Sequence, residues 1–81
     1  MPGLIRYLPE ECKLVDWRAR PALDRLAQFY IVEFETPWFG CPEWFLQIRF
    51  PDQPVTAGYY AETLEEAARL IIRSLVESRA A

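Results

Sequence analysis

Apolar and polar positions alternate most regularly near the end of the chain, over residues 63–78. Thr63 and Glu66 have the spacing of a capping box and precede an apolar run, which indicates a helix start. Two pairs of opposite charge have i,i+4 spacing and lie outside the apolar stripe: Glu65 with Arg69, and Arg73 with Glu77. The sequence therefore predicts an amphipathic helix, whose apolar stripe contains Leu64, Ala67, Ala68, Ile71, Ile72 and Leu75.

Two earlier segments, residues 29–36 and 43–50, alternate with a period of two. One continuously apolar face is typical of an antiparallel strand that is buried on one side only. We expect this face to lie beneath the helix, and it comprises Tyr30, Val32, Phe34, Trp44, Leu46, Ile48 and Phe50.

A third and shorter strand is predicted over residues 55–61. Pro51, Asp52 and Pro54 end the strand before it, because proline cannot donate a hydrogen bond within a ladder. Gly58 inside the third strand indicates either a bulge or a close approach of another group.

The predicted fold class is α+β: a three-stranded antiparallel meander packed by the C-terminal helix, in a single domain over residues 1–81. The N-terminal segment reads as short helical or strand-like structure. Residues 4–8 favour a short strand, and Pro9, followed by two acids, favours a helix start. Residues 12–17 have a strand pattern nearly as good, and Pro21 favours a further short helix with Leu23, Leu26 and Ala27 inward.

The second face of the predicted sheet is not uniformly polar. It carries Glu33, Glu35, Gln47 and Arg49, but also Phe29, Ile31 and Phe45, with Tyr60 as a further candidate. A monomer rarely leaves a large apolar patch bare, so the N-terminal segment or a partner is expected to cover it. Leu70 lies off the helix stripe. Contacts with a second copy or a partner are therefore predicted at Phe29, Ile31, Phe45 and Leu70.

The turn between the first two strands, "TPWFGCPEWF" at residues 36–45, is unusually aromatic. In one interpretation the turn folds back, and Trp38 or Phe39 caps the core. In a second, Trp38 and Phe39 are binding hot spots on a rigid, proline-braced turn, which lose little entropy on docking. The third, stacking on a ligand, lacks the convergent polar groups that such pockets use.

The net charge of −3 is unevenly distributed along the chain. Residues 33–66 hold seven acidic side chains against Arg49 alone, a net charge of −6. An acidic block speaks against direct binding of nucleic acid and is suited to a basic protein partner. We expect no membrane association. The predicted partner-binding residues are Glu33, Glu35, Trp38, Phe39, Glu43 and Asp52.

The side chains that usually carry catalysis are scarce. The chain has no histidine, its three glycines are far apart, and its two cysteines, Cys12 and Cys41, form no CxxC pair. We therefore expect no enzyme, no cofactor and no metal site. No secretion signal is apparent, so a cytoplasmic protein with free thiols is expected, with a Cys12–Cys41 disulfide as the alternative.

In this chain the strands are followed by a helix that opens with Glu62-Thr63-Leu64-Glu65-Glu66. Two known families have a similar order of strands and helix. The strand–helix part resembles antitoxins of the HicB type. It also resembles the end of double-stranded RNA-binding domains, but their helix opens with lysines, so the charge here is wrong for that role.

We interpret the chain as a small acidic interaction protein, and predict an inhibitor that blocks a basic, nucleic-acid-binding surface of its partner. Anti-CRISPR proteins and antitoxins are similar to it in size and charge. The alternative is a homo-oligomeric structural or assembly protein, of which a homodimer is the simplest form.

Overall fold

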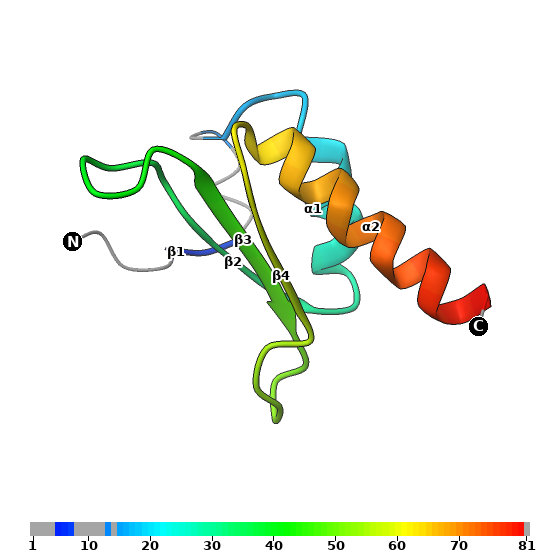
Figure 1. The fold of residues 1–81 in the computed structure, drawn as a ribbon. Helices are drawn as coiled ribbons and strands as arrows, with labels where there is room; N and C mark the ends of the chain where they lie inside the picture. Colours follow the sequence, from blue (N-terminus) through cyan, green and yellow to red (C-terminus); the bar gives the residue numbers. More distant parts are fainter. Residues whose placement is uncertain (1–4, 8–12, 14, 81) are drawn as a thin grey trace.

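The computed structural model describes residues 5–7, 13 and 15–80, and these form one four-stranded antiparallel sheet with two helices on the same side of it (Figure 1). The strands are β1 (Ile5–Arg6), β2 (Ile31–Glu35), β3 (Trp44–Arg49) and β4 (Ala57–Ala61), and they lie in sequence order across the sheet. Helix α1 spans Arg20–Ala27 and helix α2 spans Leu64–Ala80. The predicted α+β class is confirmed, and β1 extends the predicted meander by a fourth strand.

Helix α2 begins as the capping box predicts. The backbone N–H of Glu66 donates to Oγ1 of Thr63 at 3.1 Å, which satisfies one of the free donors of the first turn. The expected i,i+4 ion pairs are also present, Glu65–Arg69 at 2.6 Å and Arg73–Glu77 at 3.6 Å. These pairs lie on the exposed side of α2, so the apolar stripe is left to face the sheet.

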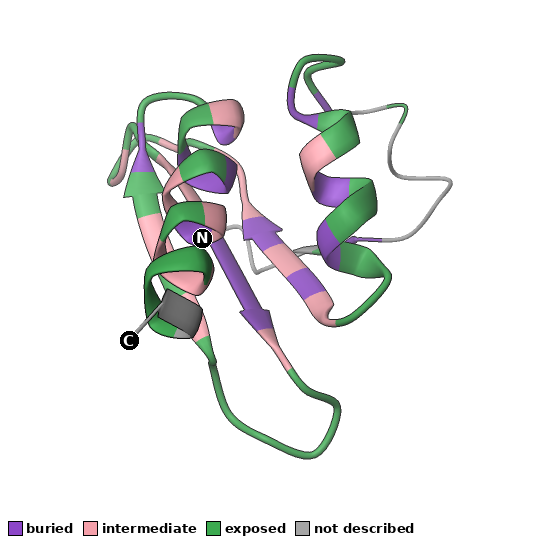
Figure 2. Ribbon diagram, turned by 90° about the vertical axis from the view of Figure 1, so that its right-hand side faces the viewer, coloured by how far each residue is buried: buried purple, intermediate pink, exposed green. Residues whose placement is uncertain are grey.

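The core is a single layer between the helices and the inner face of the sheet. Register places Val32 beside Ile48 and Phe34 beside Leu46, so the inward side chains of β2 and β3 form adjacent rows. Buried positions recur along both helices where they meet the sheet (Figure 2). The core cluster contains Tyr7, Val15, Ala19, Leu23, Leu26, Val32, Phe34, Leu46, Ile48, Ala61, Leu64, Ala67, Ala68 and Ile71.

The N-terminal part is attached to this core by the pairing of β1 with β2, by a side-chain hydrogen bond and by α1. The Tyr7 hydroxyl donates to the Asp24 carboxylate and so connects the end of β1 to α1. Helix α1 has Pro21 in its first turn, as predicted, and buries Leu23 and Leu26. Ala27 is exposed, so its predicted inward position is wrong.

Three further predictions concern residues 12–17, the segment that follows Pro9, and Gly58. None of residues 13 and 15–17 lies in a strand, so the strand predicted over residues 12–17 is absent from its described positions. The helix start predicted at Pro9 lies outside the described residues. Gly58 pairs in regular register with Gln47, which excludes a bulge and leaves the predicted close approach.

Phe50 is the exposed member of the predicted inward face. It lies one residue beyond the end of β3, and its side chain is 41% exposed. Its ring packs on Tyr30 with centroids 5.1 Å apart. The alternation fails here because the strand ends, and an end residue is no longer held over the sheet.

We predict that Ile71→Ala lowers the free energy of unfolding by about 2–5 kcal/mol, because its side chain is fully buried and truncation leaves a cavity. Val76→Ala, an exposed aliphatic truncation on the same helix, should change it by about 0.5 kcal/mol or less. Urea denaturation measures both. Equal losses would mean that α2 does not pack on the sheet through its predicted stripe.

Candidate protein-interaction site

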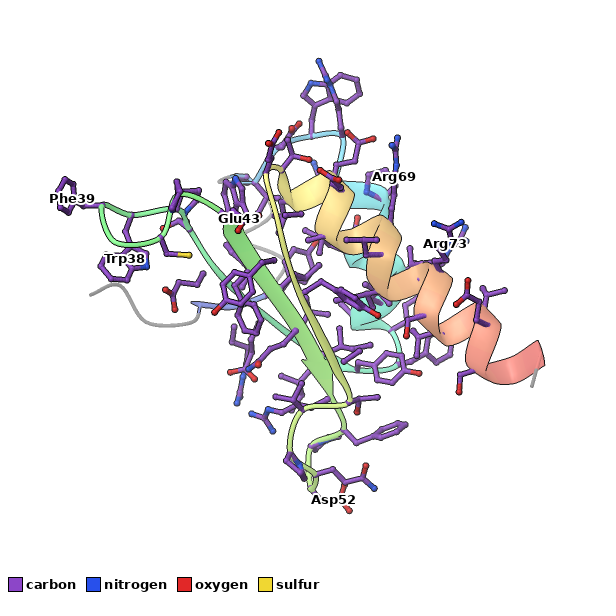
Figure 3. All side chains as sticks on the ribbon, viewed as in Figure 1. Trp38, Phe39, Glu43, Asp52, Arg69 and Arg73 are labelled. Carbon is purple, nitrogen blue, oxygen red and sulfur yellow. The ribbon has the colours of Figure 1, made fainter. Side chains whose placement is uncertain are left out.

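The connection between β2 and β3 forms a narrow hairpin that projects beyond the sheet (Figures 1 and 3). Trp38 and Cys41 close it with two backbone hydrogen bonds, each N–H donating to the other residue's carbonyl at 2.9 Å. Phe39 and Gly40 are the two residues at its tip. We call residues 36–43 the hairpin tip segment.

Gly40 is required at the tip because of space. Its backbone is not in the left-handed conformation, so freedom of φ does not explain the glycine. A Cβ at this position would overlap ring carbons Cζ3 and Cη2 of Trp38, and Cε3 would lie 3.1 Å away. The indole ring therefore lies directly over the glycine.

Trp38 is held by packing. Its indole Nε1 is buried and, within the described part of the chain, makes no hydrogen bond. Trp38 is also absent from the side chains that pack against the core cluster, whereas Trp44 belongs to them and lies 6.2 Å from Phe34 between ring centroids. Trp38 thus braces the hairpin tip segment, and Trp44 extends the core.

Phe39 is fully exposed, with a relative accessibility of 104%. Figure 3 shows its ring at the extreme end of the hairpin, pointing away from the body of the protein. The interpretation in which Phe39 folds back over the core is therefore wrong. The hairpin is too narrow to bring the ring back to the sheet, since only two residues separate the hydrogen-bonded Trp38 and Cys41.

The predicted acidic residues do not form one group. Glu35 ends β2 and Glu43 precedes β3, so both stand at the base of the hairpin tip segment. Asp52 lies in the loop between β3 and β4, at the opposite end of the sheet from Glu43 (Figure 3). Asp52 therefore cannot act together with the hairpin residues on one small epitope.

Glu33 is a poor candidate for binding a partner. Its Oε1 accepts a hydrogen bond from Nε of Arg49 at 2.7 Å across β2 and β3. The two side chains are only 16% and 21% exposed, so the pair is shielded from solvent and its charges neutralise each other. This ion pair joins the two central strands and leaves little net charge on the middle of the second sheet face.

Sequence reasoning missed Glu62 as a member of the acidic group. Trp44 pairs with Ala61, so Glu43, just before Trp44, and Glu62, just after Ala61, stand side by side at the same end of the sheet. Both are exposed. Their proximity depends on strand register, which residue patterns do not specify.

The described ion pairs show which carboxylates remain without a basic partner. Four pairs join arginines to Asp24, Glu33, Glu65 and Glu77. Among the residues that the structure describes, the acidic side chains outside these pairs are Asp16, Glu35, Glu43, Asp52, Glu62 and Glu66. Unneutralised negative charge is therefore concentrated at the hairpin end.

The second sheet face holds a small aromatic cluster. Phe45 and Tyr60 pack across β3 and β4 with ring centroids 4.6 Å apart. A Cβ on Gly58 would lie 3.1 Å from Cζ of Phe45, so the Phe45 ring covers Gly58 on the neighbouring strand β4. Ile31 is half-buried on the same face. This arrangement reduces the apolar area that Phe45 exposes.

Phe29 and Leu70 are also predicted to contact a second copy, but they do not lie on the second sheet face with Ile31 and Phe45. Phe29 lies in the turn between α1 and β2, where its N–H donates to the Leu26 carbonyl at 3.1 Å, and it lines a groove on the helix side. Leu70 is half-buried on α2. The four residues thus do not form one patch.

The described residues contain no group of three or more His, Cys, Asp or Glu side chains that could hold a metal ion. Cys41 is a free thiol, and Cys12 lies outside the described residues. The structure has, among its described helices, none that combines the length and apolar character needed to cross a membrane.

Comparison of the chain with protein-family models, with curated proteins and with solved structures finds no match. The function is therefore inferred from the geometry of this chain alone.

We predict that Gly40→Ala loosens the hairpin, because the added methyl group must displace the Trp38 ring. Amide hydrogen exchange at Trp38 and Cys41 should accelerate by about 5- to 150-fold, as a local overpacking cost of about 1–3 kcal/mol implies. In a Trp38→Ala background the same substitution should have little effect. Unchanged exchange in Gly40→Ala with Trp38 present would contradict the packing described.

A double-mutant cycle should separate the Glu33–Arg49 pair from the exposed pairs of α2. With Glu33→Gln and Arg49→Gln, we expect a coupling of about 1.5–3 kcal/mol, because this charged hydrogen bond is mostly buried. For Glu65 and Arg69, whose arginine is largely exposed, a coupling of about 0.5 kcal/mol is expected. Equal couplings would show that Glu33 remains available to a partner.

Proposed function

We propose that this protein is a non-catalytic interaction domain that binds a basic protein surface through the hairpin tip segment. Phe39 is the central apolar contact, and Glu35, Glu43 and Glu62 place negative charge at the base of the hairpin. The observation that carries the proposal is the full exposure of Phe39 on a turn whose shape is already fixed by Trp38.

The exposure of Phe39 supports a binding role because an aromatic ring in water is unfavourable for an isolated monomer. Burying such a side chain in a partner removes on the order of 150–250 Å² from water. The two hydrogen bonds between Trp38 and Cys41 hold the turn before binding, so little backbone entropy is lost on docking. Both properties are those of a hot-spot residue.

The charge around the hairpin indicates the chemistry of the partner. Glu35, Glu43 and Glu62 have no basic neighbour in an ion pair among the described residues, so their field extends into solvent. Such a field accelerates encounter with a positively charged surface and repels an acidic one. A nucleic acid is disfavoured as the direct partner for the same reason.

A basic protein surface of this kind often serves to bind nucleic acid. Occupying it with an acidic, aromatic hairpin would exclude the nucleic acid, and the protein would then act as an inhibitor in the manner of an antitoxin or an anti-CRISPR protein. The negative charge of Glu35, Glu43 and Glu62 supports this proposal of an inhibitor.

The test is affinity capture from a nuclease-treated bacterial lysate, with wild type beside Phe39→Ala and Glu43→Lys. The structure supplies matched controls at the opposite end of the sheet: Val55→Ala for the apolar truncation and Asp52→Lys for the charge reversal. We expect wild type and both controls to retain a basic protein that both hairpin variants lose. All variants should unfold at the same urea concentration, because each changed side chain is exposed.

The captured protein should then be purified and its affinity measured at two salt concentrations. Phe39→Ala should weaken binding about tenfold or more, as a hot-spot residue does. Binding by wild type should weaken with salt more steeply than binding by Glu43→Lys. Fluorescence anisotropy with labelled nucleic acid then shows whether the protein displaces it. Capture that Phe39→Ala and Asp52→Lys leave equally intact would refute the hairpin as the binding site.

A further inference from the structure

An apolar groove lies at the end of the sheet opposite the hairpin. It has a volume of about 430 Å³ and is bounded by the end of α1, the turn before β2, the residue after β3 and the second half of α2. This volume is within the range of about 300–1,000 Å³ for sites that receive ligand groups. The lining includes Arg25, Phe29, Tyr30, Phe50, Leu75 and Val76.

The groove is both apolar and accessible. Phe29 is 67% exposed and Val76 is 60% exposed, and the paired rings of Phe50 and Tyr30 form one wall. A second, smaller hollow continues between α1 and α2 and shares Arg25 and Ile72 with the first. Large apolar side chains gathered in one exposed hollow make it a candidate surface for binding another molecule.

Arg25 is the charged residue of the groove. It takes part in none of the ion pairs formed by the described residues. An occupant that satisfies this site would therefore bring an apolar side chain for the hollow and a negative charge for Arg25.

The hairpin tip segment has this chemistry. Phe39 supplies a fully exposed aromatic ring, and Glu43 supplies a carboxylate without an ion pair among the described residues. The hairpin joins the end of β2 to the start of β3, while Phe29 precedes β2 and Phe50 follows β3, so the two surfaces lie at opposite ends of the sheet. No copy can fill its own groove with its own hairpin.

We propose that the hairpin of one copy docks in this groove of a second copy, with Phe39 in the apolar hollow and Glu43 beside Arg25. The contact is heterologous, because the two surfaces that meet are different. Each docked copy presents a further hairpin and a further groove, so association continues head to tail into chains or a closed ring.

This self-association goes beyond the proposed function and places a limit on it. A hairpin docked in the groove of another copy is hidden from a basic partner, so chains form a reserve from which the partner draws monomers. The groove itself has no part in binding that partner. Substitutions in the groove therefore weaken self-association and leave the partner-binding hairpin intact, whereas Phe39→Ala weakens both interactions.

Sedimentation velocity over micromolar to millimolar protein concentrations tests the proposal. Wild type should form species that grow with concentration. Phe39→Ala disables the hairpin and Val76→Glu disables the groove, and each should raise the dissociation constant of self-association about tenfold or more. Val55→Glu, at another exposed valine outside the groove lining, is the matched control and should associate as wild type does.

The decisive sample mixes the two disabled variants. Phe39→Ala retains an intact groove and Val76→Glu an intact hairpin, so their mixture should form a 1:1 heterodimer that does not grow further. The charge contact is tested by Arg25→Glu and Glu43→Lys, each of which should associate weakly alone, whereas a chain carrying both reversals should regain association because every contact then pairs the swapped charges. Thermal unfolding confirms that each variant is folded, and Phe29→Ser replaces Val76→Glu if that variant is not.

Three results would overturn the proposal: wild type that stays monomeric at every concentration, disabled variants that fail to combine, or a dimer that survives in Val76→Glu. The last would indicate a symmetric interface elsewhere. Capture of a basic partner by wild type and by Val76→Glu, but not by Phe39→Ala, would uphold the proposed function even if self-association failed. Head-to-tail association of wild type without capture of any basic partner would uphold self-association and refute the proposed function.

Discussion

The whole structure depends on one apolar layer, packed between the stripe of α2 and the inner face of β2 and β3. A domain of this size buries a small fraction of its surface compared with larger proteins, so it has few residues with which to form a core. Here Ala67, Ala68 and Ile71 lie fully buried against the sheet. The two alanines let the helix approach closely, while Leu64 and Ile71 of α2 and Leu46 and Ile48 of β3 supply large side chains from both sides of the layer.

Because this layer is on one side only, the remaining apolar and aromatic residues must be accommodated elsewhere. Phe45 covers Gly58 and packs on Tyr60, and Trp38 covers Gly40, so each ring is packed on a glycine that leaves it room. Phe39 has no such position. Local aromatic–glycine packing thus protects two of these rings and leaves the third as the most exposed apolar group.

The two ends of the sheet differ in chemistry as a result. One end carries the projecting ring of Phe39 above carboxylates that lack basic partners, and the other carries an apolar groove with Arg25 at its side. These complementary ends are the basis of both proposals, binding of a basic protein surface and association with another copy. Which of these prevails is determined by the relative affinities and by the concentration of the protein.

The sequence by itself determined the local elements. The capping box at Thr63, the stripe of α2 and the period-two faces of β2 and β3 follow from the nearest residues, because helix and strand geometry repeat over short distances. Those patterns also identified the aromatic turn as the unusual feature. Tertiary structure alone decided whether Phe39 folds inward, that Glu62 stands beside Glu43, that Arg49 neutralises Glu33, and that Asp52 and Phe29 lie at the far end. Each of these depends on strand register and on which residues a hairpin of fixed width can reach, and such contacts between distant residues leave no periodic signal in a single chain.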